Sequence, residues 1–334
     1  MKKILIIRFS SIGDVVLISP VIRCLKMQLP DAELHVLTLK ANRLLFEHNP
    51  FISRIFTPDP TLKKIIGTLR NENYDYIVDL HKNLRSMFVK LSLRKHSASF
   101  PKLNIRKYLL VRFKINIMPD IHIVDRYFQA VKQLGVQNDG NGLDYFLPPP
   151  DYDLMKQVAV DFGTDNFPDG FVAVVIGAKH NTKILPVEKV AGVCEQLSLP
   201  AVLLGGKEDA ARGSQIVDMA CKPIVNACGS YSLHQSAMII KLSRAVLTND
   251  TGLMHIAAAF RKPTVSVWGN TVPDLGMYPY MPGDENKSVK FSVTGLSCRP
   301  CSKIGYQKCP KGHFQCMLNH DNRTLAEALD RFTR

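Results

Sequence analysis

The sequence predicts an α/β protein with two doubly wound parallel sheets. Short apolar runs alternate with segments of helical apolar spacing, which is typical of βαβ units with helices on both faces of a parallel sheet. The alternation stops at a Gly- and Pro-rich stretch and then starts again. A length of 334 residues also suits two domains. We therefore expect one domain over residues 1–147, a second over 151–320, and a final helix within 321–334.

In the first half, four short apolar runs predict buried parallel strands, at residues 3–9, 34–39, 52–56 and 76–80. Helical spacing follows the first strand over 15–29 and ends at Pro30. Another helix is predicted over 120–134, with Gly135 at its end. The polar stretch 137–144 and the triple proline 148–150 together form the best linker candidate.

The second half repeats the pattern. Its predicted strands are 171–176, 201–204, 224–226, 245–248 and 264–268, and its predicted helices are 187–197, 209–220, 233–242 and 253–260. Two such sheets joined by a linker leave a cleft between them. Since open α/β sheets bind ligands at the carboxyl ends of their strands, we looked for functional residues there.

Composition excludes several classes of protein. Hydrophobic residues make up 46% and charged residues 22%, so a largely disordered or collagen-like chain is ruled out. No apolar run approaches the roughly 20 residues that cross a bilayer, so no transmembrane helix is expected. The N-terminus begins like a signal peptide, but Arg8 interrupts the apolar stretch and no cleavage site follows. We therefore expect a cytoplasmic protein.

Positive charge is concentrated in one segment. The chain has 43 Lys and Arg against 29 Asp and Glu, a net charge of +14. Residues 80–119 contain no Asp or Glu, and their cations are Lys82, Arg85, Lys90, Arg94, Lys95, Lys102, Arg106, Lys107, Arg112 and Lys114. Apolar residues interleave with them, which favours an anionic membrane surface or an anionic lipid-linked acceptor over a merely solvated face. Nucleic acid is not expected, because no module that binds it is present.

A first candidate site follows the first strand. Ser10, Ser11 and Gly13 allow a tight turn and a capped helix whose free N–H groups can bind an anion. Asp14 has two interpretations: it complements the positive helix end, or it serves as a general base at the mouth of the cleft. No G-x-G-x-x-G or P-loop fingerprint occurs.

Three further motifs follow strands of the second half. Asp250, Thr251 and Gly252 open a helix and could cradle a pyrophosphate, with His255 one turn on; the alternative is a capped helix with a half-buried histidine. Lys183 lies in a basic loop that suits phosphate, or is simply solvated. Glu208 and Asp209 follow two glycines, where an acid either holds ribose hydroxyls or caps a helix.

Cysteines cluster near the C-terminus. Cys298, Cys301, Cys309 and Cys316, with His313 nearby, resemble a small structural zinc site, and free thiols or oxidation-prone pairs are the competing interpretation. The remaining cysteines, Cys24, Cys194, Cys221 and Cys228, are expected as scattered core residues.

Taken together, the segments IRFSSIGDVV, ILPVEKV, LLGGKED and TNDTGLMHIAAA resemble glycosyltransferase family 9, the ADP-heptose:lipopolysaccharide heptosyltransferases. The resemblance implies a GT-B fold, with two Rossmann-like domains facing across a cleft. It assigns the acceptor to the N-terminal domain and the nucleotide sugar to the C-terminal domain. It also implies that the final helix packs back on the first domain.

The resemblance carries roles onto single residues. Asp14 matches the catalytic carboxylate, Lys183 the lysine on the donor phosphates, and Glu208 or Asp209 the ribose-binding acid. The donor loop is matched by Asp250, Thr251, Gly252 and His255, and the acceptor side by Ser10, Ser11, Gly13, Arg85, Arg106 and Lys107. One departure is Ile184-Leu185-Pro186, where the family usually has an aromatic residue before the proline.

The implied function is an inverting, metal-independent transfer of a heptose or related sugar from an ADP-sugar to a lipopolysaccharide core acceptor, at the inner leaflet. The alternative is a non-catalytic glycan- or lipid-binding protein on the same fold. The sequence leaves open the sugar, the acceptor hydroxyl and the oligomeric state.

Overall fold

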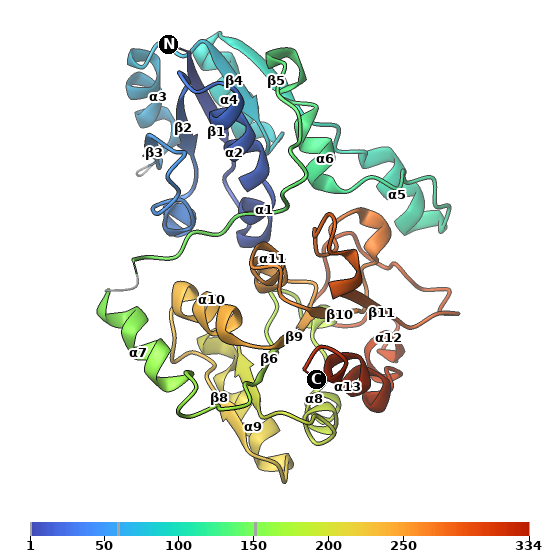
Figure 1. Ribbon diagram of the computed structural model, residues 1–334. Helices are drawn as coiled ribbons and strands as arrows, with labels where there is room; N and C mark the ends of the chain where they lie inside the picture. Colours follow the sequence, from blue (N-terminus) through green and yellow to red (C-terminus); the bar gives the residue numbers. More distant parts are fainter. Residues whose placement is uncertain (1, 59–60, 150–151, 334) are drawn as a thin grey trace. The chain divides into compact units, whose positions relative to one another are not determined.

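The computed structural model describes residues 2–58, 61–149 and 152–333. Its contacts divide the chain into two compact units (Figure 1). The first unit consists of Met1–Lys102 with Ile121–Phe146, and the second of Leu103–Asp120 with Leu147–Arg334. Each unit contains one parallel sheet with helices around it, which confirms the predicted fold class.

The first unit is built on a five-stranded parallel sheet of order β3-β2-β1-β4-β5. The strands are β1 (Lys3–Ile7), β2 (Glu33–Leu37), β3 (Arg54–Phe56), β4 (Tyr76–Asp79) and β5 (His96–Ser99). The helices are α1 (Ile12–Leu17), α2 (Ser19–Gln28), α3 (Leu62–Asn71), α4 (Leu84–Leu93) and α6 (Ile123–Phe128). Four strands were predicted; β5 was missed because its sequence, HSAS, has no apolar run and lies at the sheet edge.

The predicted helix over 15–29 is two helices, α1 and α2. Pro20 has no N–H group and cannot donate to the Val16 carbonyl one turn back. The Ser19 hydroxyl donates to that carbonyl instead, at 2.7 Å. The predicted helix over 120–134 is likewise shorter: α6 is followed by a 3-10 turn, Lys132–Leu134, which ends at Gly135 with a φ of 76°.

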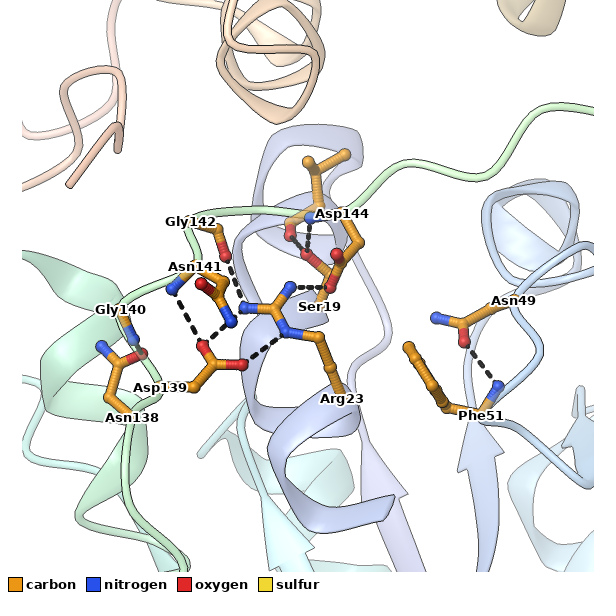
Figure 2. A network of polar contacts seen from close by, with 11 residues as sticks. Ser19, Arg23, Asn49, Phe51, Asn138, Asp139, Gly140, Asn141, Gly142 and Asp144 are labelled. Carbon is orange, nitrogen blue, oxygen red and sulfur yellow. Dashed lines mark hydrogen bonds and ion pairs between the residues drawn. The ribbon is translucent and has the colours of Figure 1, made fainter. Parts of the chain in front are cut away.

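The predicted linker over 137–144 is anchored to α2 (Figure 2). The Arg23 guanidinium, 8% exposed, binds both Asp139 oxygens at 2.8 Å and pairs with Asp144. The Asp144 backbone N–H donates to the Ser19 hydroxyl at 2.8 Å. This stretch is therefore part of the first unit, and the unit boundary falls at Phe146 and Leu147. Of the triple proline, Pro150 lies outside the described residues.

The second unit is built on a six-stranded parallel sheet of order β11-β10-β9-β6-β7-β8. The strands are β6 (Val172–Val175), β7 (Ala201–Leu204), β8 (Ile224–Asn226), β9 (Ala245–Asn249), β10 (Thr264–Trp268) and β11 (Ser288–Ser292). The longer helices are α5 (Asn104–Phe113), α7 (Asp153–Asp161), α8 (Val187–Cys194), α9 (Ala210–Met219), α10 (Leu233–Leu242), α11 (Gly252–Ala259) and α13 (Asn322–Asp330), and α12 (Gln315–Leu318) is a single turn.

Apolar cores cover both faces of this second sheet. Val172 and Val174 of β6 pack into one core, whereas Ala173 and Val175 pack into the other, as the alternation of side chains along a strand requires. All of the strands predicted in this half are present. The unpredicted β11 is a partly exposed edge strand with alternating polar residues.

Two segments group differently from the expectation. Residues 103–120, expected in the first domain, group with the second unit, where Lys114 Nζ donates to the Pro300 carbonyl at 2.6 Å and Asn116 Nδ2 to Asp274 at 2.6 Å. Helix α13 groups with the second unit and packs on α8. Its Leu325 and Leu329 are fully buried in the core of the second unit, which explains this position.

None of the helices within the described residues combines the length and the apolar character that a bilayer-spanning segment requires.

Candidate functional site

Asp14 lies just beyond the carboxyl end of the central strand β1, in the first turn of α1. Ser11 is the N-cap residue, and both its backbone N–H and its hydroxyl donate to Asp14 Oδ2, at 3.2 and 2.9 Å. The Asp14 side chain remains 22% exposed. A ligand can therefore reach a carboxylate whose orientation is fixed by the cap.

Arg8 is the second half of this site. One guanidinium nitrogen, Nη2, lies 2.6 Å from Asp14 Oδ1, and Nη1 donates to the Leu80 carbonyl and to the Tyr127 hydroxyl, the latter at 3.1 Å. Nε donates to the Ser10 carbonyl at 2.9 Å. Every nitrogen of this buried guanidinium thus has a partner, so Arg8 is held rigidly against Asp14.

The Asp14 pKa follows from these contacts. Burial alone would raise it, but the Arg8 charge and the Ser11 hydrogen bonds outweigh burial and hold the pKa of Asp14 below its ordinary value. The carboxylate is therefore ionised at neutral pH and able to accept a proton. From the sequence, Arg8 was only an interruption of an apolar run. Its position at the end of a buried strand is the feature that could have indicated a role in the site.

The other predicted acceptor residues divide between the two units. The Ser10 carbonyl and the Ser11 side chain are engaged with Arg8 and Asp14, and Gly13 is buried in α1. Arg85 is exposed on α4 of the first unit. Arg106 and Lys107 lie on α5, which groups with the second unit. The structure therefore does not gather all six in one unit.

In the second unit the predicted lysine and aspartate meet. Lys183, at the end of a 3-10 turn, places Nζ 2.6 Å from Oδ2 of Asp250, which directly follows β9. The Thr271 hydroxyl donates to the same carboxylate at 2.9 Å. Both charged side chains are mostly buried, 15% and 13% exposed.

Asn249 holds the loops of this cluster together. Its side chain is 2% exposed; Oδ1 accepts from the Leu185 N–H and Nδ2 donates to the Val175 carbonyl, both at 3.3 Å. The lysine loop, β6 and β9 are thereby tied at one sheet edge. Asn249 and Thr271 were not predicted as site residues, because neither type signals such a tie in sequence.

Helix α11 begins beside Asp250. Thr251 is its N-cap residue, and the Thr251 side chain makes no capping hydrogen bond. The first N–H groups of α11, starting at Gly252, thus form a positive helix end that can bind an anion. His255 lies in the second turn and is 2% exposed, so it is more deeply buried than the sequence suggested.

The structure distinguishes between the two candidate acids after β7. Asp209 is 4% exposed, accepts the Gly206 N–H at 3.0 Å and pairs with Arg212. A Cβ added at Gly177 would lie 2.1 Å from Asp209 Oδ2, so this carboxylate packs tightly in the loop. Glu208 is exposed and has no hydrogen-bond partner among the described residues. Glu208 is therefore the acid available to a ligand.

Asn270 is a further residue that the sequence did not indicate. It follows β10, next to Thr271, and is 1% exposed. Neither its amide oxygen nor its amide nitrogen has a hydrogen-bond partner in the described part of the chain. Since an unpaired buried amide is costly, this one is a candidate for pairing with a ligand or with water.

The cysteine cluster forms no metal-binding set. All eight cysteines are free, and Cys298 Sγ lies 3.8 Å from His313 Nε2. Burial raises the pKa of Cys316 to about 11, which favours its thiol form. No three His, Cys, Asp or Glu side chains of the described residues are grouped so that they could hold a metal ion. A structural zinc site at these cysteines therefore stays a hypothesis, and elemental analysis of the purified protein is its test.

Comparisons with known proteins agree with this picture. The profile of glycosyltransferase family 9 (heptosyltransferase) matches residues 62–308. Lipopolysaccharide heptosyltransferase 1 of Campylobacter coli is 22% identical over 296 residues, covering 80% of this chain and 84% of the relative.

Solved structures show the same fold. The structure of E. coli ADP-heptose lps heptosyltransferase II aligns with a TM-score of 0.72 at 22% identity. The alignment covers 100% of this chain and 98% of the E. coli chain. A glycosyltransferase family 9 protein from Veillonella parvula aligns with a TM-score of 0.77 at 19% identity. The alignment covers 99% of this chain and 97% of the Veillonella chain. The two Rossmann-like units therefore make up a GT-B fold, and the chain belongs to glycosyltransferase family 9, the heptosyltransferases.

Proposed function

We propose that this glycosyltransferase moves a heptose or closely related sugar from an ADP-sugar to a lipopolysaccharide core acceptor, with inversion at the anomeric carbon. The observation that carries the proposal is the Asp14 carboxylate, held ionised and oriented by Arg8 and Ser11. The first unit takes the acceptor and the second takes the donor.

Asp14 acts as the general base. It accepts the proton of an acceptor hydroxyl while that oxygen attacks the anomeric carbon of the donor. The bond from that carbon to the diphosphate breaks in the same step, so one displacement inverts the centre. Ser11 and Arg8 keep the carboxylate in one orientation, which supports proton transfer along a fixed direction.

The leaving diphosphate is stabilised by groups of the second unit. The Lys183 ammonium and the N-terminus of α11 at Thr251 and Gly252 supply positive charge. Without donor, Lys183 is paired with Asp250; a bound diphosphate shares that lysine. These groups take the place of a divalent metal, so we propose that transfer needs no metal ion.

Donor recognition involves three more residues. Glu208 is exposed beside Gly206, which supports its assignment as the acceptor of ribose hydroxyl groups. The amide of Asn270, buried close to Thr271, is suited to hydrogen bonding with the donor. His255, buried in the second turn of α11, is the third residue that we assign to donor binding.

The acceptor is anionic and lipid-linked. The segment 80–119, with its ten cations and no acid, would hold the phosphorylated core of such an acceptor. We therefore propose a protein of the cytoplasm that works peripherally at the inner membrane.

The test combines binding with transfer. A thermal-shift panel of ADP-, UDP- and GDP-sugars should show stabilisation by ADP-heptose, about 2.7 kcal/mol at 100 times its Kd. Incubation with a lipopolysaccharide core lacking its outer heptoses should then yield a product whose anomeric configuration, read by NMR, is opposite to that of the donor. A preference for UDP-sugars, or retention of configuration, would refute the proposal.

A further inference from the structure

Helix α4 presents an apolar stripe to solvent. Leu84, Met87, Phe88 and Leu91 follow the i, i+3, i+4, i+7 spacing of one helical face, and they are 78%, 47%, 38% and 68% exposed. Ser86, Val89 and Leu93 form the opposite face and are buried. The helix therefore has two apolar faces, of which only one is used by the core of the first unit.

A basic hollow of about 500 Å³ lies at the C-terminal end of α4. Its lining residues include three cations and two neutral polar residues beside apolar ones: Leu69, Arg70, Asn73, Tyr74, Ser92, Leu93, Arg94 and Lys95. None of the three cations has a carboxylate partner among the residues that the structure describes. Three uncompensated positive charges around a hollow with neutral hydrogen-bonding groups suit a phosphate group.

This hollow is distinct from the proposed active site. Asn73 and Tyr74 precede β4, and Lys95 precedes β5, so the hollow lies at the amino-terminal edge of the first sheet. Asp14 follows β1 and lies at the carboxyl edge. Helix α4 runs from the carboxyl edge to the hollow, about 15 Å for its ten residues, and its exposed stripe joins the two edges.

An anionic bilayer fits this surface better than a protein or a nucleic acid. Exposed Arg85, Arg94 and Lys95 accompany the stripe, and no acid occurs between residues 80 and 119. Apolar side chains beside cations of one sign are typical of helices that lie in a membrane interface. Protein interfaces are instead depleted of lysine, and of the four stripe side chains only Phe88 is an aromatic ring that could stack on a nucleic-acid base.

We propose that the exposed face of α4 and the Arg70–Arg94–Lys95 hollow form a membrane-docking surface, in which the stripe enters the interface and the hollow binds the phosphate of an anionic phospholipid. The inference deepens the proposed membrane location by assigning it to this face. It also assigns a phospholipid phosphate to a hollow at the opposite edge of the first sheet from Asp14.

Vesicle co-sedimentation tests the inference without any sugar donor. Vesicles of phosphatidylcholine alone are compared with vesicles in which part of the lipid is phosphatidylglycerol. We expect binding only to the anionic vesicles, and weaker binding at high salt. Arg94→Asn with Lys95→Gln should weaken it about 25-fold, about fivefold for each cation. Asparagine is chosen because Arg94 has a φ of 52°, a conformation that asparagine tolerates.

Matched controls lie on the same unit. Lys63→Gln with Lys64→Gln removes the same charge from exposed positions of α3 and should leave binding unchanged. Leu91→Ser should weaken binding about tenfold, whereas Met27→Ser, at a residue 66% exposed against 68% for Leu91, should not. Circular dichroism checks that each variant is folded.

Three results would overturn the inference: equal binding to neutral and anionic vesicles, α4 variants that bind like their controls, or light scattering that shows a dimer dissociated by Leu91→Ser. The transferase proposal is tested separately, on the wild-type protein, by transfer to a delipidated, soluble core acceptor. If the protein binds anionic vesicles but transfers no sugar, only the proposed function is refuted.

Discussion

Arg8 shows how one buried side chain sets the chemistry of another. Its partners, the Leu80 carbonyl and the Tyr127 hydroxyl, are 72 and 119 residues away in sequence. Without this cation, Asp14 would be a partly buried carboxylate with only the Ser11 hydrogen bonds to favour its charge. Arg8 therefore both favours the ionised form of Asp14 and ties together segments that are distant in the chain.

We expect Arg8→Gln to raise the pKa of Asp14, because burial then dominates. The acid limb of kcat/KM should move to higher pH, and kcat should fall about 100-fold, as for loss of general base catalysis. Arg8→Lys should restore part of kcat because it restores the charge, and donor binding should stay unchanged in both variants. A pH–rate profile of Arg8→Gln identical to that of the wild type would contradict this role.

Lys183 and Asp250 allow a test of the donor side. Lys183→Ala removes the cation and leaves Asp250 unneutralised, so ADP binding should weaken about 100-fold by calorimetry. Adding Asp250→Asn removes the repulsion and should regain part of that loss, a non-additive result expected for residues in contact. Strict additivity, or unchanged binding in Lys183→Ala, would show that the diphosphate binds elsewhere.

At the residue scale, the sequence could predict groups that stand at strand ends. Asp250 directly follows β9, whereas Asp14 and Lys183 lie in the segments that lead on from the ends of β1 and β6. The choice between Glu208 and Asp209 needed the packing of Asp209 against Gly177 and Gly205. Arg8 and Asn270 owe their importance to neighbours that are distant in the chain, which no local pattern reveals.

At the scale of elements, Arg23 determines the course of the segment 137–144. Its hydrogen bonds hold the pKa of Asp139 well below the usual value, so the contact stabilises the fold while Asp139 is ionised. This stability is present above the unfolded carboxyl pKa of about 3.9 and is lost as the pH falls through the lower folded value. Burial raises the pKa of Asp144, so the ionisation of Asp144 lowers the stability of the fold, whereas that of Asp139 increases it.

Asp139→Asn isolates one of these two carboxylates. At neutral pH it should lower the free energy of unfolding by about 2 kcal/mol, since a charge-assisted pair becomes a neutral one. Urea titrations at decreasing pH should show this difference shrinking below pH about 4. Asp31→Asn, at an exposed position of the same unit, is the control and should change little. A difference that is constant with pH would argue against the ion pair as its source.

Strands and helices could be predicted from the sequence where their own residues show an apolar run or helical apolar spacing. The buried strands β1, β4, β6, β7 and β9 are apolar runs, and α10 has the bounds expected from its spacing. The edge strands β5 and β11 lack such runs. The break between α1 and α2 depends on the missing N–H of Pro20, and the anchored segment 137–144 depends on Arg23, more than 100 residues earlier.

For the whole molecule, the single tryptophan is a reporter of one unit. Trp268 ends β10, is 1% exposed and directly precedes Gly269, Asn270 and Thr271 of the proposed donor site. If ADP binds to the second unit, the unfolding followed by Trp268 fluorescence should shift upward, by about 2.7 kcal/mol at 100 times its Kd. Lys183→Ala should reduce the shift to about 0.4 kcal/mol at the same ADP concentration, whereas a shift of wild-type size in this variant would place the nucleotide elsewhere.

In the proposed reaction, Asp14 takes the acceptor proton while the second unit binds the donor independently of Asp14. The most direct measurement is single-turnover transfer from ADP-heptose by wild type and Asp14→Asn, with ADP affinity determined on the same samples. We predict that the substitution lowers the transfer rate at least about 1,000-fold, as expected for removal of the group that accepts the proton, and leaves the affinity for ADP unchanged. Transfer at the wild-type rate by Asp14→Asn would contradict the account.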